Sequence, residues 1–308
     1  MRILISGTTG LVGTALIPKL EADGHEVIRL VRDKKLQGAR QIHWSPENHQ
    51  LDARLLEGCE VVIHLGGEGI ASGRWTSARK KLLRDSRIKS TRLLAESVAK
   101  MNTKPHAFLC ASAIGIYGDR DDAILDEHSS GGSDFLATLA QDWEAACLPA
   151  AAVGVRVIHL RFGVILSARG GALKKMLPIF RLGLGGVIGS GMQYMSWVSI
   201  DDVVHVIEWL LRHDEIDGPV NVVSPKPVMN RDFTRALSDA LRRPTMLPVP
   251  GYVLRLLFGE MAVSTILASQ HVYPAKLISN GYDFQHSELS AALRTLLLAS
   301  PGERISKP

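Results

Sequence analysis

Residues 2–13 read RILISGTTGLVG, an apolar run followed by glycines at positions 7, 10 and 13. The pattern predicts a strand over 2–6, a tight turn, and a helix that opens in the turn and ends at Gly24. Glycine lets the backbone turn sharply and approach a pyrophosphate, while the start of a helix offers free N–H groups and partial positive charge. A strand, turn and helix in this order are typical of dinucleotide binding, and a plain strand-to-helix connection is the weaker alternative.

Strand and helix signals alternate along the rest of the first half. Apolar runs predict strands over 25–32, 59–67, 106–112 and 155–163, and helical spacing predicts helices over 77–100 and 133–150. A short strand and a helix follow over 196–213, and another strand over 218–224. Strands buried on both faces and separated by helices indicate an α/β fold with a doubly wound parallel sheet.

Two segments break the alternation. Residues 168–195 are rich in glycine, and prolines at 244, 248 and 250 lie among mixed helical segments after residue 225. We therefore expect residues 1–167 and 196–224 to form a dinucleotide-binding domain. Residues 168–195 and 225–308 are expected to form a smaller substrate-side lobe.

Composition disfavours several classes of function. The 308 residues carry a net charge of +5, and the densest basic group, at 79–89, has the spacing of a solvated helix face. Aromatic residues make up 6% and do not alternate with this group, so no nucleic-acid partner is expected. Three scattered cysteines, Cys59, Cys110 and Cys147, indicate no metal site. Without a signal-peptide layout or an apolar run of membrane length, a cytoplasmic protein with no membrane contact is expected.

The end of the second predicted strand, Val31-Arg32-Asp33, bears on the choice of cofactor. An acidic residue about 20 positions after the glycines would bind the ribose hydroxyls of NAD, whereas an arginine would pair with the 2′-phosphate of NADP. Arg32 ends the strand and Asp33 already lies in the loop, so NADP(H) is preferred and NAD(H) is the alternative. Both residues are otherwise ordinary surface charges. The expected contacts in the glycine turn are Gly7, Thr8, Thr9, Gly10, Leu11, Val12 and Gly13.

Six segments in a fixed order carry a more specific resemblance. After GTTGLVG come HLGGEGI with RW at 74–75, SRIKST at 86–91, SAIGIYGD at 112–119, FRLGLGGVIGSGMQYMSWVSIDD at 180–202 and QHVYPAKLISNGYDF at 270–284. Together they resemble the YfcH-like, epimerase-type branch of the atypical short-chain dehydrogenase/reductases, over nearly the whole chain. The resemblance implies an extended Rossmann fold, NADP(H) binding and a nucleoside-diphosphate-sugar epimerase label with a poorly defined substrate.

The resemblance also implies particular cofactor contacts. Arg32 and Arg87 become candidate contacts to the cofactor phosphates, and Leu65 and Gly66 are expected to line the cofactor. Glu68 follows them and is either functional or a solvated loop acid. A homodimer is common in the superfamily and is expected on that ground alone.

The catalytic residues of the superfamily are missing from their places. Ser or Thr orients a substrate oxygen there, Tyr moves a proton, and Lys lowers the pKa of that Tyr from its ordinary value near 10. Aligned on Tyr117-Gly118, these positions hold Ala113, Phe135 and Leu139. Tyr117 and Ser112 lie at a strand end, where this fold binds ligands, and are the candidate replacements. Tyr117 packing over the next loop is the structural alternative.

Other polar residues have structural explanations. Asp134, Asp201 and Asp202 are expected to cap helices more than to catalyse. Gln193 and Tyr194 lie in the glycine-rich insertion, which could close over a substrate or form plain turns. Glu144 is expected at the surface, and His64, His159 and His205 in predicted strands or helices.

Three functions follow as hypotheses. The first is an NADP-dependent oxidoreductase or epimerase with a rebuilt site, since hydride transfer is the cofactor's chemistry and the protein supplies position and one acid or base. The second is a catalytically inactive NADP(H)-binding regulator or scaffold, since some relatives in the branch carry cell-division labels. The third, a nucleic-acid binder using the basic helix, is the weakest.

Overall fold

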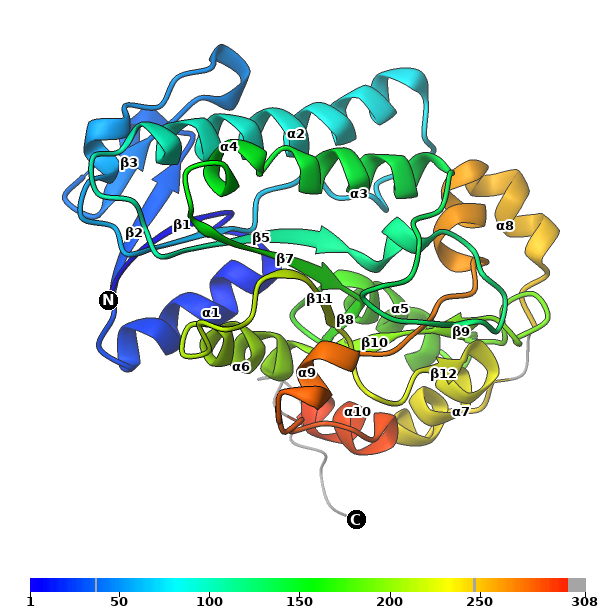
Figure 1. Ribbon diagram of the computed structural model, residues 1–308. Coiled ribbons are helices and arrows are strands. Elements are labelled where there is room, and N and C mark those ends of the chain that lie inside the picture. The colour runs from blue at the N-terminus through cyan, green and yellow to red at the C-terminus, as the bar shows by residue number, and fades with distance from the viewer. Residues whose placement is uncertain (37, 246–247, 299–308) are drawn as a thin grey trace.

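The protein is described by a computed structural model that covers residues 1–36, 38–245 and 248–298 (Figure 1). In these residues seven strands form one parallel sheet in the order β11-β7-β5-β4-β1-β2-β3. Their bounds are β1 Arg2–Ser6, β2 Glu26–Val31, β3 Gln41–His43, β4 Val61–His64, β5 Ala107–Ala113, β7 Arg156–Phe162 and β11 Gly218–Val222. The predicted doubly wound parallel sheet is confirmed.

Helices cover both faces of the sheet (Figure 1). One face holds α1 (Leu11–Ala22) and α6 (Ile200–Leu210), and the other holds α2 (Ser77–Lys100), α3 (Phe135–Ala145) and the short α4 (Leu148–Ala151). Ile3 and Ile5 of β1 share a buried cluster with Leu16 of α1, while Leu4 shares another with Leu94 of α2. Alternate residues of one strand thus enter opposite cores, which is why the strands read as continuous apolar runs.

The helix starts follow capping chemistry. The Asp134 side chain accepts a hydrogen bond from the Ala137 N–H at 2.8 Å, so the expected cap of α3 is confirmed. At α6 the expectation was wrong, because the cap is Ser199, whose hydroxyl accepts from the Asp202 N–H at 2.9 Å. The Asp202 carboxylate instead accepts hydrogen bonds from the backbone N–H groups of Gln285 and His286, at 2.8 and 3.1 Å.

Short strands and helices build the region beyond the sheet. Two pairs of strands are β8 (Val164–Ser167) with β10 (Trp197–Ser199) and β9 (Tyr194–Met195) with β12 (Val228–Met229); a third joins β6 (Ile124–Leu125) to β13 (His271–Val272). The helices are α5 (Gly171–Arg181), α7 (Asn230–Leu241), α8 (Gly251–Phe258), α9 (Ala275–Ser279) and α10 (Leu289–Leu298). Single turns are η1 (Lys34–Leu36), η2 (Pro46–Asn48), η3 (Ala53–Leu56), η4 (Ile114–Tyr117) and η5 (Ala262–Ile266).

The region assigned to a substrate-side lobe packs on the core of the sheet. Leu173 of α5, Phe233 of α7 and Leu293 of α10 belong to the same buried cluster as Ile3. The division of the chain at residues 167, 195 and 224 stays a prediction, and residues 299–308 of the proposed lobe lie outside the described residues. Within the described part of the chain, every helix is too short or too polar to cross a membrane.

Candidate functional site

The glycine turn after β1 is closed tightly against the end of β4. Gly7 has φ +73°, and a Cβ atom there would lie 2.6 Å from the Leu65 carbonyl oxygen and 2.8 Å from the Gly66 nitrogen. A Cβ on Gly13 would overlap the carbonyl oxygen of Gly7. Only glycine fits at these two places, because one needs a left-handed conformation and both allow a very close backbone approach.

The turn presents the open end of a helix. Gly10 is the N-cap of α1 and makes no side-chain capping bond, and the first turn of the helix contains no acidic residue. The N–H groups of this first turn therefore lack intrahelical partners, and they combine with the helix dipole to favour an anion. Thr8 is half-buried and Thr9 exposed beside it, whereas the Val12 side chain enters the core.

The two charged residues after β2 differ in what they contact. Asp33 accepts a hydrogen bond from the Lys35 N–H at 2.9 Å, which fixes its carboxylate in the turn of η1. Arg32 directly follows Val31, the last residue of β2, and its exposed side chain has no partner among the described residues. Of Arg32 and Asp33, Arg32 is the one whose side chain is free to bind an anion.

A buried cation lies under the end of β4. Arg87 of α2 is 9% exposed, and its guanidinium donates to the Leu83 carbonyl at 3.1 Å and lies 4.9 Å from the Trp143 ring centroid. A Cβ on Gly67 would lie 3.4 Å from the Arg87 Cζ atom. Burial lowers the pKa of Arg87 to about 10, so the group is still charged at neutral pH. No carboxylate among the described residues forms an ion pair with it.

Glu68 turns toward α2 in this structure. Its carboxylate pairs with Arg79 at 3.1 Å, and its backbone N–H donates to the Ser86 hydroxyl at 3.2 Å. These contacts hold the loop after β4 against α2. A direct contact of Glu68 to the cofactor stays a prediction.

An apolar cluster fills the places of the missing catalytic Tyr and Lys. The Phe135 ring lies 5.2 Å from the Trp75 ring, centroid to centroid, and 4.8 Å from the Lys80 ammonium group. Leu139 is buried in a cluster with Trp75, Leu83 and Met261. Lys80 is itself paired with Glu260 at 2.6 Å. Neither the Phe135 nor the Leu139 side chain can donate or accept a proton, and neither can shift the pKa of a group that does.

The two candidate replacements lie in an interior polar network. Tyr117 has no exposed surface; its hydroxyl donates to the Asn221 Oδ1 atom at 2.7 Å and accepts from Arg161 at 2.9 Å. Burial raises the pKa of Tyr117, with Arg161 opposing the shift. The Ser112 hydroxyl donates to Glu144 at 2.6 Å. These contacts favour the structural explanation of Tyr117 and Ser112 over a catalytic one.

Glu144 is the residue whose placement the sequence missed. It was expected at the surface, but it forms a two-point ion pair with Arg161, with both N–O distances 2.9 Å. Burial alone would raise the pKa of Glu144, but the Arg161 guanidinium outweighs it and the pKa is lowered. The ion pair joins α3 to β7. Its partners are 17 residues apart on different elements, so no local pattern marks them.

The histidines have structural surroundings. His64 is fully buried between the hydroxyls of Ser6 and Ser90, and burial lowers its pKa to about 3. His159 is largely buried with a lowered pKa, again from burial. Among the described residues no group of three or more His, Cys, Asp or Glu side chains could hold a metal ion.

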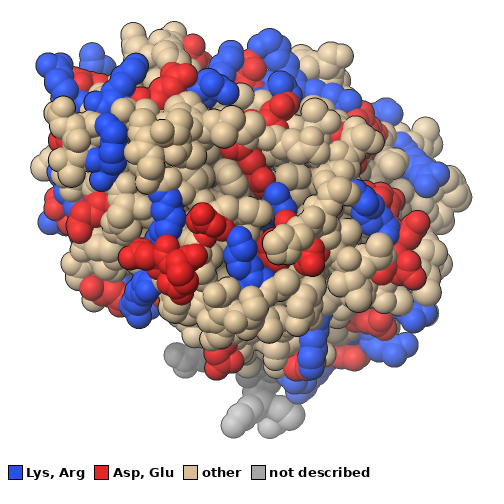
Figure 2. Space-filling model, viewed as in Figure 1, with Lys and Arg blue, Asp and Glu red and all other residues tan. Residues whose placement is uncertain are grey.

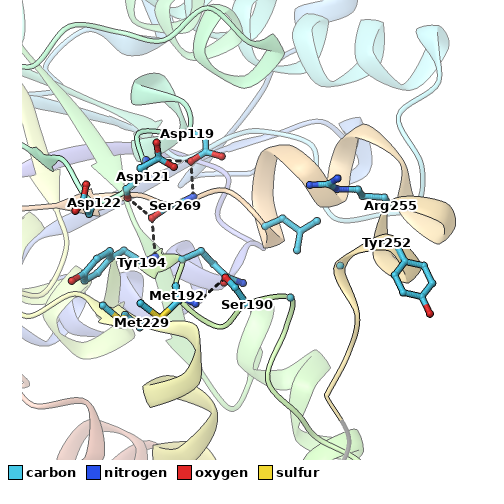
Figure 3. A pocket seen from close by; sticks show the side chains of 14 residues that line it. Asp119, Asp121, Asp122, Ser190, Met192, Tyr194, Met229, Tyr252, Arg255 and Ser269 are labelled. Atoms are coloured by element: carbon cyan, nitrogen blue, oxygen red, sulfur yellow. Dashed lines mark hydrogen bonds between the residues drawn. The ribbon is translucent and has the colours of Figure 1, made fainter.

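A cavity of about 720 Å³ opens beyond the carboxyl edge of the sheet (Figure 3). Asp119, Asp121 and Asp122, which follow η4, form one wall, and Arg255 of α8 lies across from them. Gln193 and Tyr194 of the glycine-rich insertion also line the cavity. Ligands of this fold bind at the carboxyl ends of the strands, so the cavity is the natural place for a substrate. The acidic run DRDD at 119–122 was a visible signal that the sequence analysis left unused.

With this geometry in place, comparison with known proteins settles the family. Residues 3–223 match the NAD dependent epimerase/dehydratase family. The chain belongs to that family. Residues 249–296, which include α8 and α9, match a domain of unknown function, DUF1731. The resemblance to the epimerase-type branch is thereby confirmed.

Relatives of this epimerase-family chain extend over nearly its full length. Epimerase family protein Mb2239 of Mycobacterium bovis is 41% identical over 291 residues, 94% of this chain and 96% of the relative. The crystal structure of the human epimerase family protein SDR39U1 (isoform 2) with NADPH has a TM-score of 0.89 and 34% identity, covering 97% of this chain and 100% of that one. A nucleoside-diphosphate sugar epimerase of Corynebacterium glutamicum has a TM-score of 0.80 and 36% identity, covering 96% of this chain and 58% of that one.

Proposed function

We propose that this chain binds NADP(H) across the carboxyl edge of the sheet and exchanges a hydride with a small molecule held in the 720 Å³ cavity. The observation that carries the proposal is the tight glycine turn at residues 7–13, called the cofactor cradle below. A Cβ atom on Gly7 or Gly13 would clash with the backbone there. The human relative crystallised with NADPH supports the choice of cofactor.

Each part of the cradle has a distinct task. The N–H groups at the start of α1 bind the pyrophosphate, because they are unpaired and lie at the positive end of the helix dipole. Arg32 binds the 2′-phosphate of the adenosine ribose, and the buried Arg87 adds a second cation for the phosphates. Leu65 and Gly66 form the wall against which the cofactor lies. When bound, the cofactor supplies the hydride chemistry.

The proton that accompanies a hydride needs another source than α3. The cluster around Phe135 and Leu139 offers no phenol and no free amine. The site therefore supports hydride exchange with a proton taken from another group or from water. A nucleoside-diphosphate sugar stays a candidate substrate on the strength of the Corynebacterium glutamicum relative's description.

A second candidate function rests on the same cluster. A chain that keeps the cofactor cradle but packs Trp75 against Phe135 has the features of an NADP(H)-binding regulator or scaffold without turnover. A link to cell division remains a part of this alternative. Steady oxidation of NADPH in the presence of any carbonyl substrate would decide against it.

The first prediction concerns Arg32. Replacing Arg32 with Ala should weaken NADPH binding roughly tenfold to a hundredfold and leave NADH binding unchanged, because only NADPH loses a charge-assisted hydrogen bond. Fluorescence titration of the reduced cofactors measures both constants. Arg92→Ala, an exposed arginine on α2, is the matched control. Equal losses for NADPH and NADH would contradict the assignment of Arg32.

A further inference from the structure

We propose that the 720 Å³ cavity takes a small dipolar substrate, with a cationic group at the three aspartates and a carboxylate or carbonyl oxygen at Arg255. Such a cavity disfavours nucleoside-diphosphate sugars. The inference rests on the proposed function, which places the substrate in this cavity.

One wall of the cavity is negatively charged. Asp119, Asp121 and Asp122 line it, and none of them forms an ion pair with a cation of the described residues. Arg120, which lies between them in the sequence, donates instead to the backbone carbonyls of Tyr117 and Ser130. Three exposed carboxylates without an ion pair give this wall a negative potential.

The acidic wall is held in place by its backbone and by Ser269. Asp119 accepts a hydrogen bond from the Ser269 N–H at 3.0 Å, and the Ser269 hydroxyl donates to the Asp121 carbonyl (Figure 3). The same hydroxyl accepts from the Tyr194 N–H at 3.0 Å. Asp119 thus helps to hold the wall in place. The carboxylates of Asp121 and Asp122 are exposed and make no hydrogen bond or ion pair with the described residues, so a ligand can contact them.

The opposite wall is positive. Arg255 lies on α8 across the cavity from the aspartates (Figure 3). Gly251, the first residue of α8, also lines the cavity, so the positive end of the helix dipole adds to the Arg255 charge. The charged walls therefore form a dipole, and a ligand with opposite charges at its two ends matches both.

The side of the cavity between these walls is apolar and flat. Tyr194 stacks on His271 with ring centroids 4.1 Å apart and an interplanar angle of 16°. Met192, Met229 and Leu267 complete this side. A planar or apolar skeleton can lie on this surface while its ends reach the charged walls.

A diphosphate fits this cavity poorly. Diphosphate sites usually combine several Arg or Lys side chains with a helix N-terminus. Here Arg255 is the one Lys or Arg among the described lining residues, and three aspartates line the same cavity. The cavity of this chain thus differs in charge from what the sugar-nucleotide label of the Corynebacterium glutamicum relative would require.

Saturation-transfer NMR with matched probes tests the inference on the whole chain, with and without NADPH. The probes are 4-(aminomethyl)benzoate, which has both charges, benzylamine, 4-methylbenzoate and UDP-glucose. We expect 4-(aminomethyl)benzoate to bind most tightly and benzylamine next, with 4-methylbenzoate about tenfold weaker than benzylamine and UDP-glucose weakest. Asp121→Asn with Asp122→Asn should abolish the preference for the ammonium group, and Arg255→Gln should abolish the gain from the carboxylate.

The controls separate this inference from the proposed function. Glu215→Gln with Asp283→Asn changes the net charge equally at exposed sites outside the cavity and should leave the probe order unchanged. The inference is overturned if UDP-glucose or 4-methylbenzoate binds best, if no probe binds, or if the aspartate variant keeps the preference. NADPH titration of the same samples tests the proposed function alone, because the probe order can be measured on the cofactor-free chain.

Discussion

Tyr117 ends η4, the turn that follows the carboxyl end of β5, and its hydroxyl is buried. It joins Asn221 of β11 to the Arg161–Glu144 ion pair. Because the network satisfies polar groups that would otherwise be buried without partners, each member stabilises the others. At the residue scale, the position of Tyr117 is thus better explained by its buried hydrogen bonds than by a catalytic role.

Replacing Tyr117 with Phe should lower the free energy of unfolding by about 1–3 kcal/mol, because Asn221 and Arg161 each lose a buried hydrogen-bond partner. The NADPH dissociation constant of the folded variant should match that of the wild type. Urea unfolding and cofactor titration measure the two quantities. Tyr252→Phe, at a side chain that is 72% exposed, is the control for losing a hydroxyl. Unchanged stability with weakened cofactor binding would return Tyr117 to the functional site.

Single residues differ in how far the sequence predicts them. Gly7 and Gly13 could be predicted because their spacing after a strand reflects a backbone requirement. Arg32 was expected to end the second strand, but β2 ends at Val31, so Arg32 is the first residue after it. Asp33 lies in the following turn, as expected, and accepts a hydrogen bond there. Glu144 could not be placed, because its environment depends on Arg161, a residue distant in the sequence.

At the element scale, helix α3 packs apolar side chains at the two positions that the superfamily pattern assigns to Tyr and Lys. Its first turn packs Phe135 against Trp75, and its second buries Leu139 beside Met261. The loop before α2 supplies Trp75, and the Trp75 indole N–H donates to the Ile70 carbonyl at 2.9 Å. The cluster thus ties the loop after β4 to α3.

Restoring the superfamily pair should therefore damage this helix. Phe135→Tyr with Leu139→Lys is expected to destabilise the fold by about 3 kcal/mol or more, because an unpaired ammonium group would lie in an apolar cluster. Thr138→Lys, one residue earlier at an exposed position, should have little effect. Thermal unfolding compares the variants. A double variant as stable as the wild type would show that the cluster is open to charge and remains a usable catalytic position.

The elements themselves were largely predictable, because apolar periodicity reports burial. The helix predicted over 77–100 is α2 as observed, whereas the helix predicted over 133–150 begins at Phe135 and divides into α3 and α4. The sequence predicted one continuous helix because residues 146–150, which span the break between α3 and α4, have a composition typical of helices. Short paired strands such as β9 and β12 escaped prediction, since two residues carry no periodicity.

At the scale of the whole molecule, charge and packing limit what the surface can do. The basic residues of 79–89 are largely used within the protein: Lys81 and Lys89 pair with Asp85, Arg84 with Asp142, and Lys80 with Glu260. On the face shown in Figure 2, basic and acidic side chains are interspersed. The absence of a nucleic-acid partner and the formation of a homodimer both stay predictions.

A buried carboxylate adds to the apolar packing that holds the C-terminal segment on the core of the sheet. Asp202 of α6 accepts from the backbone of Gln285 and His286, and Tyr282 packs beside it with its hydroxyl 3.4 Å from the carboxylate. The order of the elements was predictable from the sequence, but this attachment was not, because Asp202 resembles an ordinary capping residue. The cavity and the cofactor cradle thus lie on one continuously packed body.

The central claim is that the chain holds NADP(H), and the molecules carried by the freshly purified protein test it most directly. Mass spectrometry of the small molecules released on denaturation should find NADP⁺ or NADPH, or protein stripped of cofactor should take up NADPH in preference to NADH. NAD⁺ or NADH in their place would contradict the role of Arg32. No released dinucleotide, together with no binding of NADPH at millimolar concentration, would contradict the claim itself and leave the Gly7–Gly13 cradle as inherited architecture.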